Sequence, residues 1–415
     1  MHCFFQSTFF NFEFVRFGGA EVAECLQAAA NNDPDSWHRA WTAQAEEAAA
    51  RAQEVLMASD FVSTRRAFLR ASNYFRASGY MFNDGPTTPN PHVLPIAART
   101  IDHFGQAVLL LDTKAQSVEI PFERRLLPGY LYLPPPHRRA KGKIPVLIHL
   151  GGADSIQEEL YYVYAATGPD LGYAVLTFDG PGQDIMLRHD KQYMRPDWEV
   201  VVAAVLDWLS AFCAQHPELE LDTDRIGVAG SSMGGYYALR AAADPRVRAC
   251  VSIDPFYDMW DFAVHHILPA LINWWRAGWI PTALLNGAVE LASRLSFQTR
   301  WEVDLARWFF GVKTPTDTLL EMRKYTLKRP DGSSLLKRVH CPVLVSGAAE
   351  SLYLKTQADT FKVYNALDHV PESKKSVWIA KEPEDGGLQA KIGAIGLLAQ
   401  RTFQFLDEQL SVDRN

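Results

Sequence analysis

One serine in this chain stands where a tight turn would expose its hydroxyl. Ser232 lies at the centre of Gly230-Ser231-Ser232-Met233-Gly234, a Gly-x-Ser-x-Gly pattern that follows the strand-like stretch 226–229 and leads into a helical stretch of small residues. A strand, a sharp turn and a helix form the context in which such a serine acts as a nucleophile, because small neighbours leave room for its strained backbone. The pattern therefore predicts Ser232 as a nucleophile at a carbonyl carbon.

Backbone amides beside this serine could stabilise the negative oxygen of such a reaction. The N–H of Met233, at the start of the helix, would face the developing oxyanion. The apolar stretch that ends in His149-Leu150-Gly151-Gly152 would supply the second donor from the Gly151 and Gly152 backbone. His149 either assists this oxyanion hole or packs as a strand-end residue.

Glu350 is predicted as the acidic member of a catalytic triad. In enzymes built on this turn, the chain order is serine, then Asp or Glu, then histidine. Gly347-Ala348-Ala349-Glu350 follows the predicted next-to-last strand, where such an acid orients an imidazole. Asp254, at the end of the preceding strand, is a weaker candidate.

The composition is that of a globular protein without a nucleic-acid or membrane partner. The 415 residues are 48% hydrophobic and 21% charged, with a net charge of −7 and no basic patch. The apolar stretch 267–295 is interrupted by prolines and charges, so it is too broken to span a bilayer. The N-terminus lacks the basic segment of a signal peptide. Five widely spaced cysteines without a Cys-x-x-Cys pair indicate reduced thiols, no metal site and a cytoplasmic location.

Residues 1–115 are predicted to form an N-terminal helical domain. Asp33-Pro34-Asp35-Ser36 signals a helix start, and tryptophans and alanines recur after it at spacings of three and four. Further helices are predicted over 63–81 and 92–110. The arginines of the 63–81 helix are interpreted as a solvated face rather than an anion site; they are Arg65, Arg66, Arg70 and Arg76.

Residues 116–415 are predicted to form an α/β core with a mostly parallel sheet, because apolar strand patterns alternate with helical ones. The strand patterns cover 117–122, 127–133, 144–150, 173–178, the stretch before Ser232, 247–253, 342–346 and 376–380. The alternation is interrupted at about 258–330 by a helical segment dense in tryptophan and phenylalanine. An insertion here would lie over the carboxyl ends of the strands, so we expect a lid over an apolar substrate pocket.

The chain resembles the α/β-hydrolase superfamily, in the branch whose members carry a helical domain before the core. The resemblance spans residues 37–391, and the branch includes dihydroxypseudooxynicotine hydrolase and fungal hydrolases of fusarin, cytochalasan and naphthopyrone biosynthesis. It implies an α/β-hydrolase fold, and by analogy a homodimer. The segments that carry it are 37–41, Ala67 to Phe75, Gly151-Gly152-Ala153-Asp154-Ser155, Phe178-Asp179-Gly180-Pro181-Gly182-Gln183, the serine turn, Gly347 to Glu350 and Gly386 to Lys391.

The histidine that such a triad needs is missing. No histidine follows His369, and the resemblance aligns Gln389 with the position where relatives carry the histidine. An amide cannot accept the serine proton at neutral pH, and loss of a general base lowers a rate by about 10²–10⁴.

Three explanations remain open. Another residue could serve as base, and the candidates are His369, His340, His265, His266 and Lys391. The reaction could instead be an aldol or Knoevenagel-type ring closure, which needs an acid or base and an oxyanion hole but no acyl-enzyme. The chain could also be a non-catalytic relative.

The sequence as a whole indicates an enzyme that acts on a bulky apolar small molecule. The resemblance implies fungal secondary metabolism, with ester or C–C hydrolysis, or carbonyl cyclisation, of a polyketide or polyketide-peptide intermediate. No nucleotide, flavin or metal signature is present, so no cofactor is expected. The alternative is a catalytically silent binding or scaffold protein on the same fold.

Overall fold

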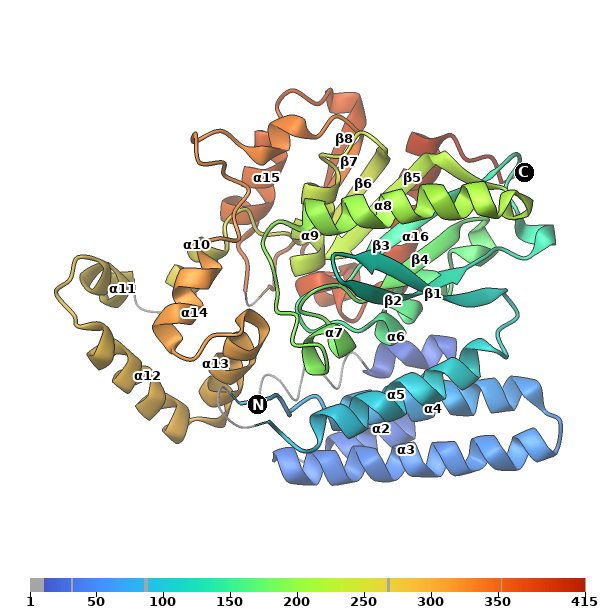
Figure 1. Cartoon of the computed structure of the whole chain (residues 1–415), viewed down its shortest axis with the longest axis horizontal. Helices are drawn as coiled ribbons and strands as arrows, with labels where there is room; N and C mark the ends of the chain where they lie inside the picture. Colours follow the sequence, from blue (N-terminus) through green and yellow to red (C-terminus); the bar gives the residue numbers. More distant parts are fainter. Residues whose placement is uncertain (1–10, 31–32, 86–88, 267–268, 352, 415) are drawn as a thin grey trace.

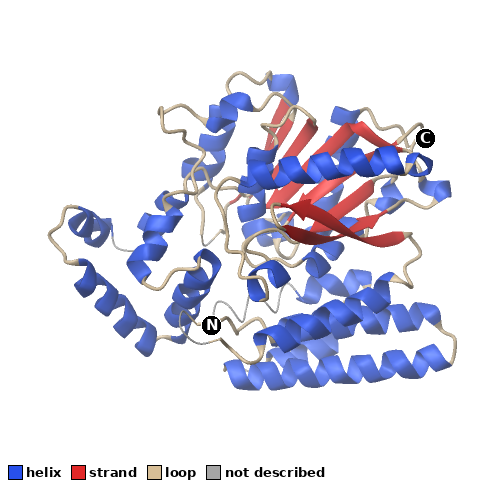
Figure 2. Cartoon of the chain, in the orientation of Figure 1, coloured by secondary structure: helices blue, strands red, loops and turns tan. Residues whose placement is uncertain are grey.

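A computed structural model describes residues 11–30, 33–85, 89–266, 269–351 and 353–414 (Figure 1). Helices form a layer below a single twisted sheet, and a second group of helices projects to the left of the sheet (Figure 2). The fold is the predicted α/β arrangement, with helices on both faces of the sheet.

The sheet has eight strands in the order β1-β2-β4-β3-β5-β6-β7-β8. β1 and β2 form an antiparallel hairpin, β2 pairs with β4 antiparallel, and the remaining neighbours are parallel. The strands are β1 (Ala115–Phe122), β2 (Arg125–Tyr132), β3 (Ile144–Leu150), β4 (Ala174–Phe178), β5 (Leu221–Ser231), β6 (Val247–Ile253), β7 (Val343–Ala348) and β8 (Lys375–Ala380).

Two separate apolar layers hold helices on the two faces of the sheet. Even-numbered residues of β3 such as Val146 and Ile148 pack in one core with α8 (Trp198–Gln215) and α9 (Met233–Ala241), whereas Leu147 packs in the other with α16 (Ile395–Leu410). β3 is buried along its whole length, as a strand covered on both faces should be. Among the described residues, α8 alone is long and apolar enough to cross a membrane by length and composition, but its buried residues belong to the core.

The N-terminal helices begin where the capping residues predict. Asp33 accepts a hydrogen bond from the Ser36 N–H at 3.0 Å and starts the longest helix, with Pro34 at its first position. Trp37 and Trp41 are fully buried, and the Trp37 indole donates to the Ala77 carbonyl at 2.8 Å. The helices are α2 (Val22–Ala29), α3 (Pro34–Met57), α4 (Phe61–Ser78) and α5 (Val93–Val108).

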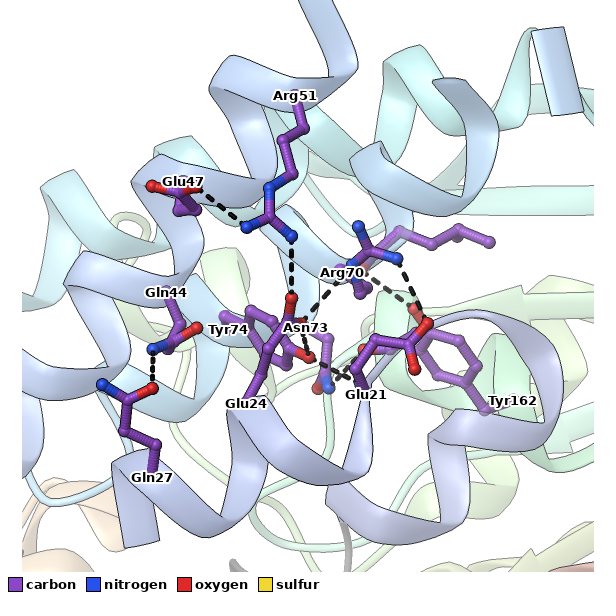
Figure 3. Close-up of polar contacts among 12 residues, drawn as sticks. Glu21, Glu24, Gln27, Gln44, Glu47, Arg51, Arg70, Asn73, Tyr74 and Tyr162 are labelled. Carbon is purple, nitrogen blue, oxygen red and sulfur yellow. Dashed lines mark hydrogen bonds and ion pairs between the residues drawn. The ribbon is translucent and has the colours of Figure 1, made fainter. Parts of the chain in front are cut away.

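A polar network joins α2 to α3 and α4 (Figure 3). The Tyr74 hydroxyl accepts from the Glu21 N–H at 2.7 Å and donates to Glu24 at 2.6 Å. Arg51 contacts Glu24 at 3.4 Å, and Arg70 contacts both glutamates at 3.4–3.5 Å. The prediction of a solvated arginine face is therefore wrong for Arg70, because its side chain is mostly buried between acidic groups.

Five helices are inserted between β6 and β7 at the carboxyl end of the sheet, within the range predicted for the lid. In Figure 1 they lie to the left of the sheet, and Trp301 of this segment donates to the Tyr80 carbonyl, just after α4, at 3.3 Å. The inserted helices are α10 (Met259–His266), α11 (Pro269–Arg276), α12 (Thr282–Leu295), α13 (Phe297–Phe310) and α14 (Pro315–Met322).

Tyr74→Phe should destabilise the protein by about 1–3 kcal/mol, because it leaves the Glu21 N–H and the Glu24 carboxylate without their shared hydroxyl. Urea unfolding of the variant measures this loss. The matched control is Tyr364→Phe, whose exposed hydroxyl donates to Glu372 at 2.8 Å and whose removal should change the free energy of unfolding little. Equal effects of the two substitutions would contradict the role of the Tyr74 network.

Candidate functional site

The predicted strand–turn–helix geometry is present at Ser232. The residue has φ 55° and ψ −116° between β5 and α9, a conformation that costs about 1–3 kcal/mol. Its N–H donates to the Ile253 carbonyl at 2.8 Å, which fixes the turn against the end of β6. Ser232 and Met233 both line a cavity of about 680 Å³ at the carboxyl end of the sheet.

The glycines of the turn allow it to pack directly on the end of β3. A Cβ atom on Gly234 would lie 2.4 Å from the Leu150 carbonyl oxygen, and one on Gly230 would lie 2.3 Å from the Gly234 carbonyl oxygen. Real atoms do not approach this closely, so each glycine is required here by contact. The turn and the loop after β3 are thereby held side by side.

The loop after β3 differs in one respect from the predicted oxyanion hole. The Gly152 N–H donates to the Ser155 hydroxyl oxygen at 2.9 Å, so it is already occupied. The next amide, that of Ala153, has no acceptor among the described residues, and Ala153 lines the cavity. Met233 lies in the first turn of α9, where a helix offers its N–H no acceptor. Met233 and Ala153 thus both line the cavity, and their amides have no acceptor among the described residues.

Gln183, in the Asp-Gly-Pro-Gly-Gln segment, holds this loop in place. Its Nε2 donates to the Gly152 carbonyl at 3.1 Å, and its Oε1 accepts from the Gly180 N–H at 2.8 Å. From the sequence, this segment is recognised only through its resemblance to the family. The structure gives it a positioning role, because Gln183 links the turn after β4 to the oxyanion loop.

Glu350 does not reach the cavity, so its prediction as the triad acid is wrong in position. Its N–H donates to the Gly387 carbonyl at 2.9 Å, and this turn directs the side chain outward, where it is exposed. The next residue points inward instead: the Ser351 hydroxyl donates to Gln389 Oε1 at 2.5 Å. A neutral hydroxyl therefore stands beside Gln389, where a carboxylate was expected.

Gln389 lines the same cavity as Ser232, and its amide is held at both ends. Its Oε1 accepts from Ser351, and its Nε2 donates to the Asp254 carbonyl at 3.2 Å. With Oε1 assigned as the acceptor of a hydroxyl proton, the amide has a fixed orientation, and one Nε2 hydrogen remains for the cavity. Gln389 is therefore a hydrogen-bond donor and cannot act as the base that a triad requires.

A buried ion pair lies beneath this amide. Lys391 Nζ contacts Asp254 Oδ1 at 2.7 Å and the Gly347 carbonyl at 3.1 Å, and both charged side chains are almost completely buried. Burial lowers the pKa of Lys391, and the Asp254 carboxylate opposes that shift. Lys391 is not among the cavity-lining residues, so it positions Asp254 rather than serving as the base.

The histidines do not supply the missing base in the predicted way. His369 bonds the Val339 carbonyl through Nε2 at 2.7 Å and packs on His340, and neither residue lines the cavity. The side chains of His265 and His266 lie outside the described residues. His149 does line the cavity, but burial lowers its pKa to about 3, so its imidazole is neutral and a weak base.

Three buried carboxyl groups form a cluster behind the oxyanion loop. Glu158, Asp179 and Asp184 bring oxygens within 4.8 Å of one another, and Arg188 contacts Asp184 at 2.7 Å. Burial, followed by mutual repulsion, raises the pKa of Glu158 and Asp179 well above the usual range. Asp179 Oδ1 accepts a hydrogen bond from the Gln157 N–H at 2.9 Å and so holds the start of α6 (Gln157–Leu160), whereas both carboxyl oxygens of Glu158 lack a hydrogen-bond partner among the described residues.

The cavity wall is mostly apolar and comes from three parts of the chain. The lid contributes side chains such as Leu285 and Phe309, and the N-terminal helices reach in through Arg76 and Tyr80. Of the lid tryptophans, Trp301 lines the cavity, whereas Trp274 and Trp279 are 49% and 75% exposed and do not line it. The side chain of Phe262 lies outside the described residues.

A serine on a strained strand–turn–helix bend, facing a cavity beneath a helical insertion, is the arrangement of an enzyme of the α/β-hydrolase class. The alpha/beta hydrolase family model matches residues 146–380, and the chain belongs to this family. The chain is 60% identical to the hydrolyase poxO of Penicillium oxalicum, over all of both chains. It is 49% identical to the hydrolase ORFZ of Pyricularia oryzae, over all of this chain and 99% of that protein.

One solved structure shares the fold over nearly the whole chain. The 2,6-dihydroxy-pseudo-oxynicotine hydrolase superposes with a TM-score of 0.72, at 21% identity, over 97% of this chain and 96% of its own. The likeness includes the helices before the sheet, as expected of the branch inferred from the sequence.

Gly234→Ala should abolish activity and destabilise the fold, because the new methyl group would overlap the Leu150 carbonyl and separate the serine turn from the oxyanion loop. The matched control is Gly287→Ala in α12, where nothing lies within 4 Å of the added carbon and stability should stay the same or rise slightly. Thermal unfolding of both variants measures the contrast. A Gly234→Ala protein as stable as the control would contradict the close packing.

Asp254→Ala should lower the free energy of unfolding by about 3–5 kcal/mol, because Lys391 would remain buried without its partner. The same change should make the Gln389 side chain less ordered, because Gln389 donates to the main-chain carbonyl of Asp254, and the Asp254 side chain helps to hold that residue in place. Asp368→Ala, which removes the exposed partner of Lys337, is the control and should leave stability nearly unchanged. Urea denaturation compares the two, and a tolerated Asp254→Ala would show that the buried pair is dispensable.

Proposed function

We propose that this enzyme belongs to fungal secondary metabolism and closes a ring in an apolar polyketide-like intermediate by carbonyl condensation of the aldol or Knoevenagel type. The similarity to proteins of Penicillium oxalicum and Pyricularia oryzae supports the fungal setting. The predominantly apolar cavity of about 680 Å³ has the size and lining suited to a bulky substrate.

The single observation that carries this proposal is the held amide of Gln389. An acyl-enzyme mechanism needs a base that takes the Ser232 proton, and Gln389 offers only a donor at the position of that base. A condensation needs different groups: a carbonyl oxygen held by Met233 and Ala153 amides, with hydroxyl and amide donors beside it. Ser232 would then donate a hydrogen bond to a carbonyl instead of attacking it.

Hydrolysis of an ester or a C–C bond is the second candidate. The relatives carry the names hydrolase and hydrolyase, and the strained serine turn that favours nucleophilic attack is intact in this chain. A binding protein without activity, the alternative left open by the sequence, is not favoured, because the relatives are named hydrolase and hydrolyase.

Reaction with a fluorophosphonate probe separates these candidates. Ser232 should react slowly in the wild type, at about the rate left when a general base is lost, 10²–10⁴ below an active triad. The double variant Gln389→His with Ser351→Asp should react faster, because it places an imidazole and a carboxylate where the amide and hydroxyl now meet. Ser232→Ala is the negative control, because it lacks the hydroxyl that the probe labels. Rapid wild-type labelling that disappears in Ser232→Ala would favour hydrolysis.

Product analysis then tests condensation directly. A 1,3-dicarbonyl compound with a tethered aldehyde should lose one water and cyclise in the presence of the wild type. Ser232→Ala should slow this reaction without stopping it. An unchanged compound would overturn the proposal, and a compound cleaved by water would replace it with the hydrolytic one.

A further inference from the structure

The reaction proposed above needs a group that moves protons, and one ionisable side chain is suitably placed for it. Glu159, in α6, lines the same cavity as Ser232 and is 8% exposed. α6 begins directly after the oxyanion loop, so the carboxylate and the oxyanion donors belong to one short segment, 152–159. Glu159, Ser232 and the oxyanion loop therefore border one and the same cavity.

The other ionisable groups of the cavity are less suitable. Asp154 and Glu302 are exposed to water, and the guanidinium of Arg76 does not release its proton. His149 is a weak base, as described above, and burial raises the pKa of Tyr80 well above its usual value. Glu159 is the one carboxylate among the described lining residues that is shielded from solvent.

The position of Glu159 is fixed from a second part of the chain. Arg76, in α4, contacts Glu159 Oε2 at 3.0 Å, and Arg76 is itself held by the Asn73 side chain at 3.0–3.1 Å. Ser155 links Glu159 to the oxyanion loop. Its hydroxyl accepts a hydrogen bond from the Gly152 N–H, and its hydrogen bond to the Glu159 carboxylate lowers the pKa of Glu159. A held carboxylate within reach of the substrate is what proton transfer requires.

We propose that Glu159 is the general base and then the general acid of the condensation, and that the substrate supplies a carbon acid flanked by two carbonyl groups. This inference rests on the proposed function. Glu159 takes a proton from the flanked carbon, and the C–H electron pair moves into the enolate, whose oxygen lies on the Met233 and Ala153 amides. The enolate carbon forms a bond to the carbon of a third, tethered carbonyl group, whose C=O electron pair moves onto its oxygen, and the resulting alkoxide takes the proton from Glu159.

Loss of water completes the step without any other reactant. Glu159 takes the remaining proton of the same carbon, the C=C bond forms, and the hydroxyl leaves as hydroxide. The hydroxide and the proton on Glu159 combine as water, so the carboxylate is restored and all atoms balance.

The surroundings of Glu159 adjust its proton affinity to this use. Burial raises the pKa of Glu159 to about 7, while Arg76 opposes the shift and Asp154 adds to it. A base with a pKa near the working pH is the most effective kind. The titratable and charged groups around it are Arg76 and Tyr80 from the N-terminal helices, Asp154 from the loop, Glu158 from α6 and Asp184 from α7 (Asp184–Arg188).

Exchange of the flanked carbon's proton for deuterium tests Glu159 without the full reaction. N-Decyl-3-oxobutanamide carries the carbon acid and an apolar chain but no second electrophile, and proton NMR in D₂O follows the loss of its methylene signal. The wild type should accelerate exchange, with a rate that rises with pH through about 7 as Glu159 ionises. Glu159→Gln keeps the contact with Arg76 and should lower the enzymatic rate by about 10²–10⁴. Glu159→Asp should retain part of the rate.

The control is Glu199→Gln, which alters another partly buried Glu–Arg pair, with Arg240 at 2.5–2.8 Å, away from the cavity. It should leave exchange and its pH profile unchanged. If folded Glu159→Gln exchanged the proton at the wild-type rate, the role of Glu159 would be refuted, but the proposed condensation would not. No acceleration by the wild type would overturn the proposed condensation and this role together.

Discussion

The contact between the serine turn and the end of β3 is the constraint on which the rest of the site depends. β3 and β5 are parallel neighbours, and Leu150 lies opposite Gly230 in the register. The two strands therefore end together, and the loop that follows one meets the turn that follows the other. Only glycine at 230 and 234 allows the contact, because a Cβ at either position would overlap backbone atoms.

The amide of Gln389 depends on a different chain of interactions. Lys391 is paired with Asp254 in the core, Asp254 offers its carbonyl to Gln389, and Ser351 fixes the other end of the amide. Ala390 and Lys391 both have positive φ, at 58° and 60°, so this segment is strained and held by its contacts. Together, these contacts stabilise one orientation of the neutral Gln389 amide, in which its NH₂ group is the donor.

The sequence predicts the fold well and the site in part. Strand alternation, the glycines around Ser232 and the cap at Asp33 are local signals, and local signals determine elements and their order. The position of Glu350 also follows from local spacing, but whether residue 350 or 351 faces inward depends on a turn closed by Gly387, which is distant in the chain. The occupied amide of Gly152 likewise depends on the rotamer of Ser155. Pairings such as Lys391 with Asp254, 137 residues apart, have no signal in the sequence of one chain.

The N-terminal helices are part of the site as well as a covering for the sheet. Arg76 comes from α4, yet it pairs with Glu159 of the core, and Tyr80 follows the same helix into the cavity. Arg76 was interpreted from the sequence as part of a solvated face, because a helix pattern alone does not reveal a carboxylate 83 residues away. An ion pair between the two units fixes Glu159 only when the helices are docked. The charge environment of the cavity therefore depends on the packing of α4 against α6, so the helices before the sheet contribute to the site beneath the lid.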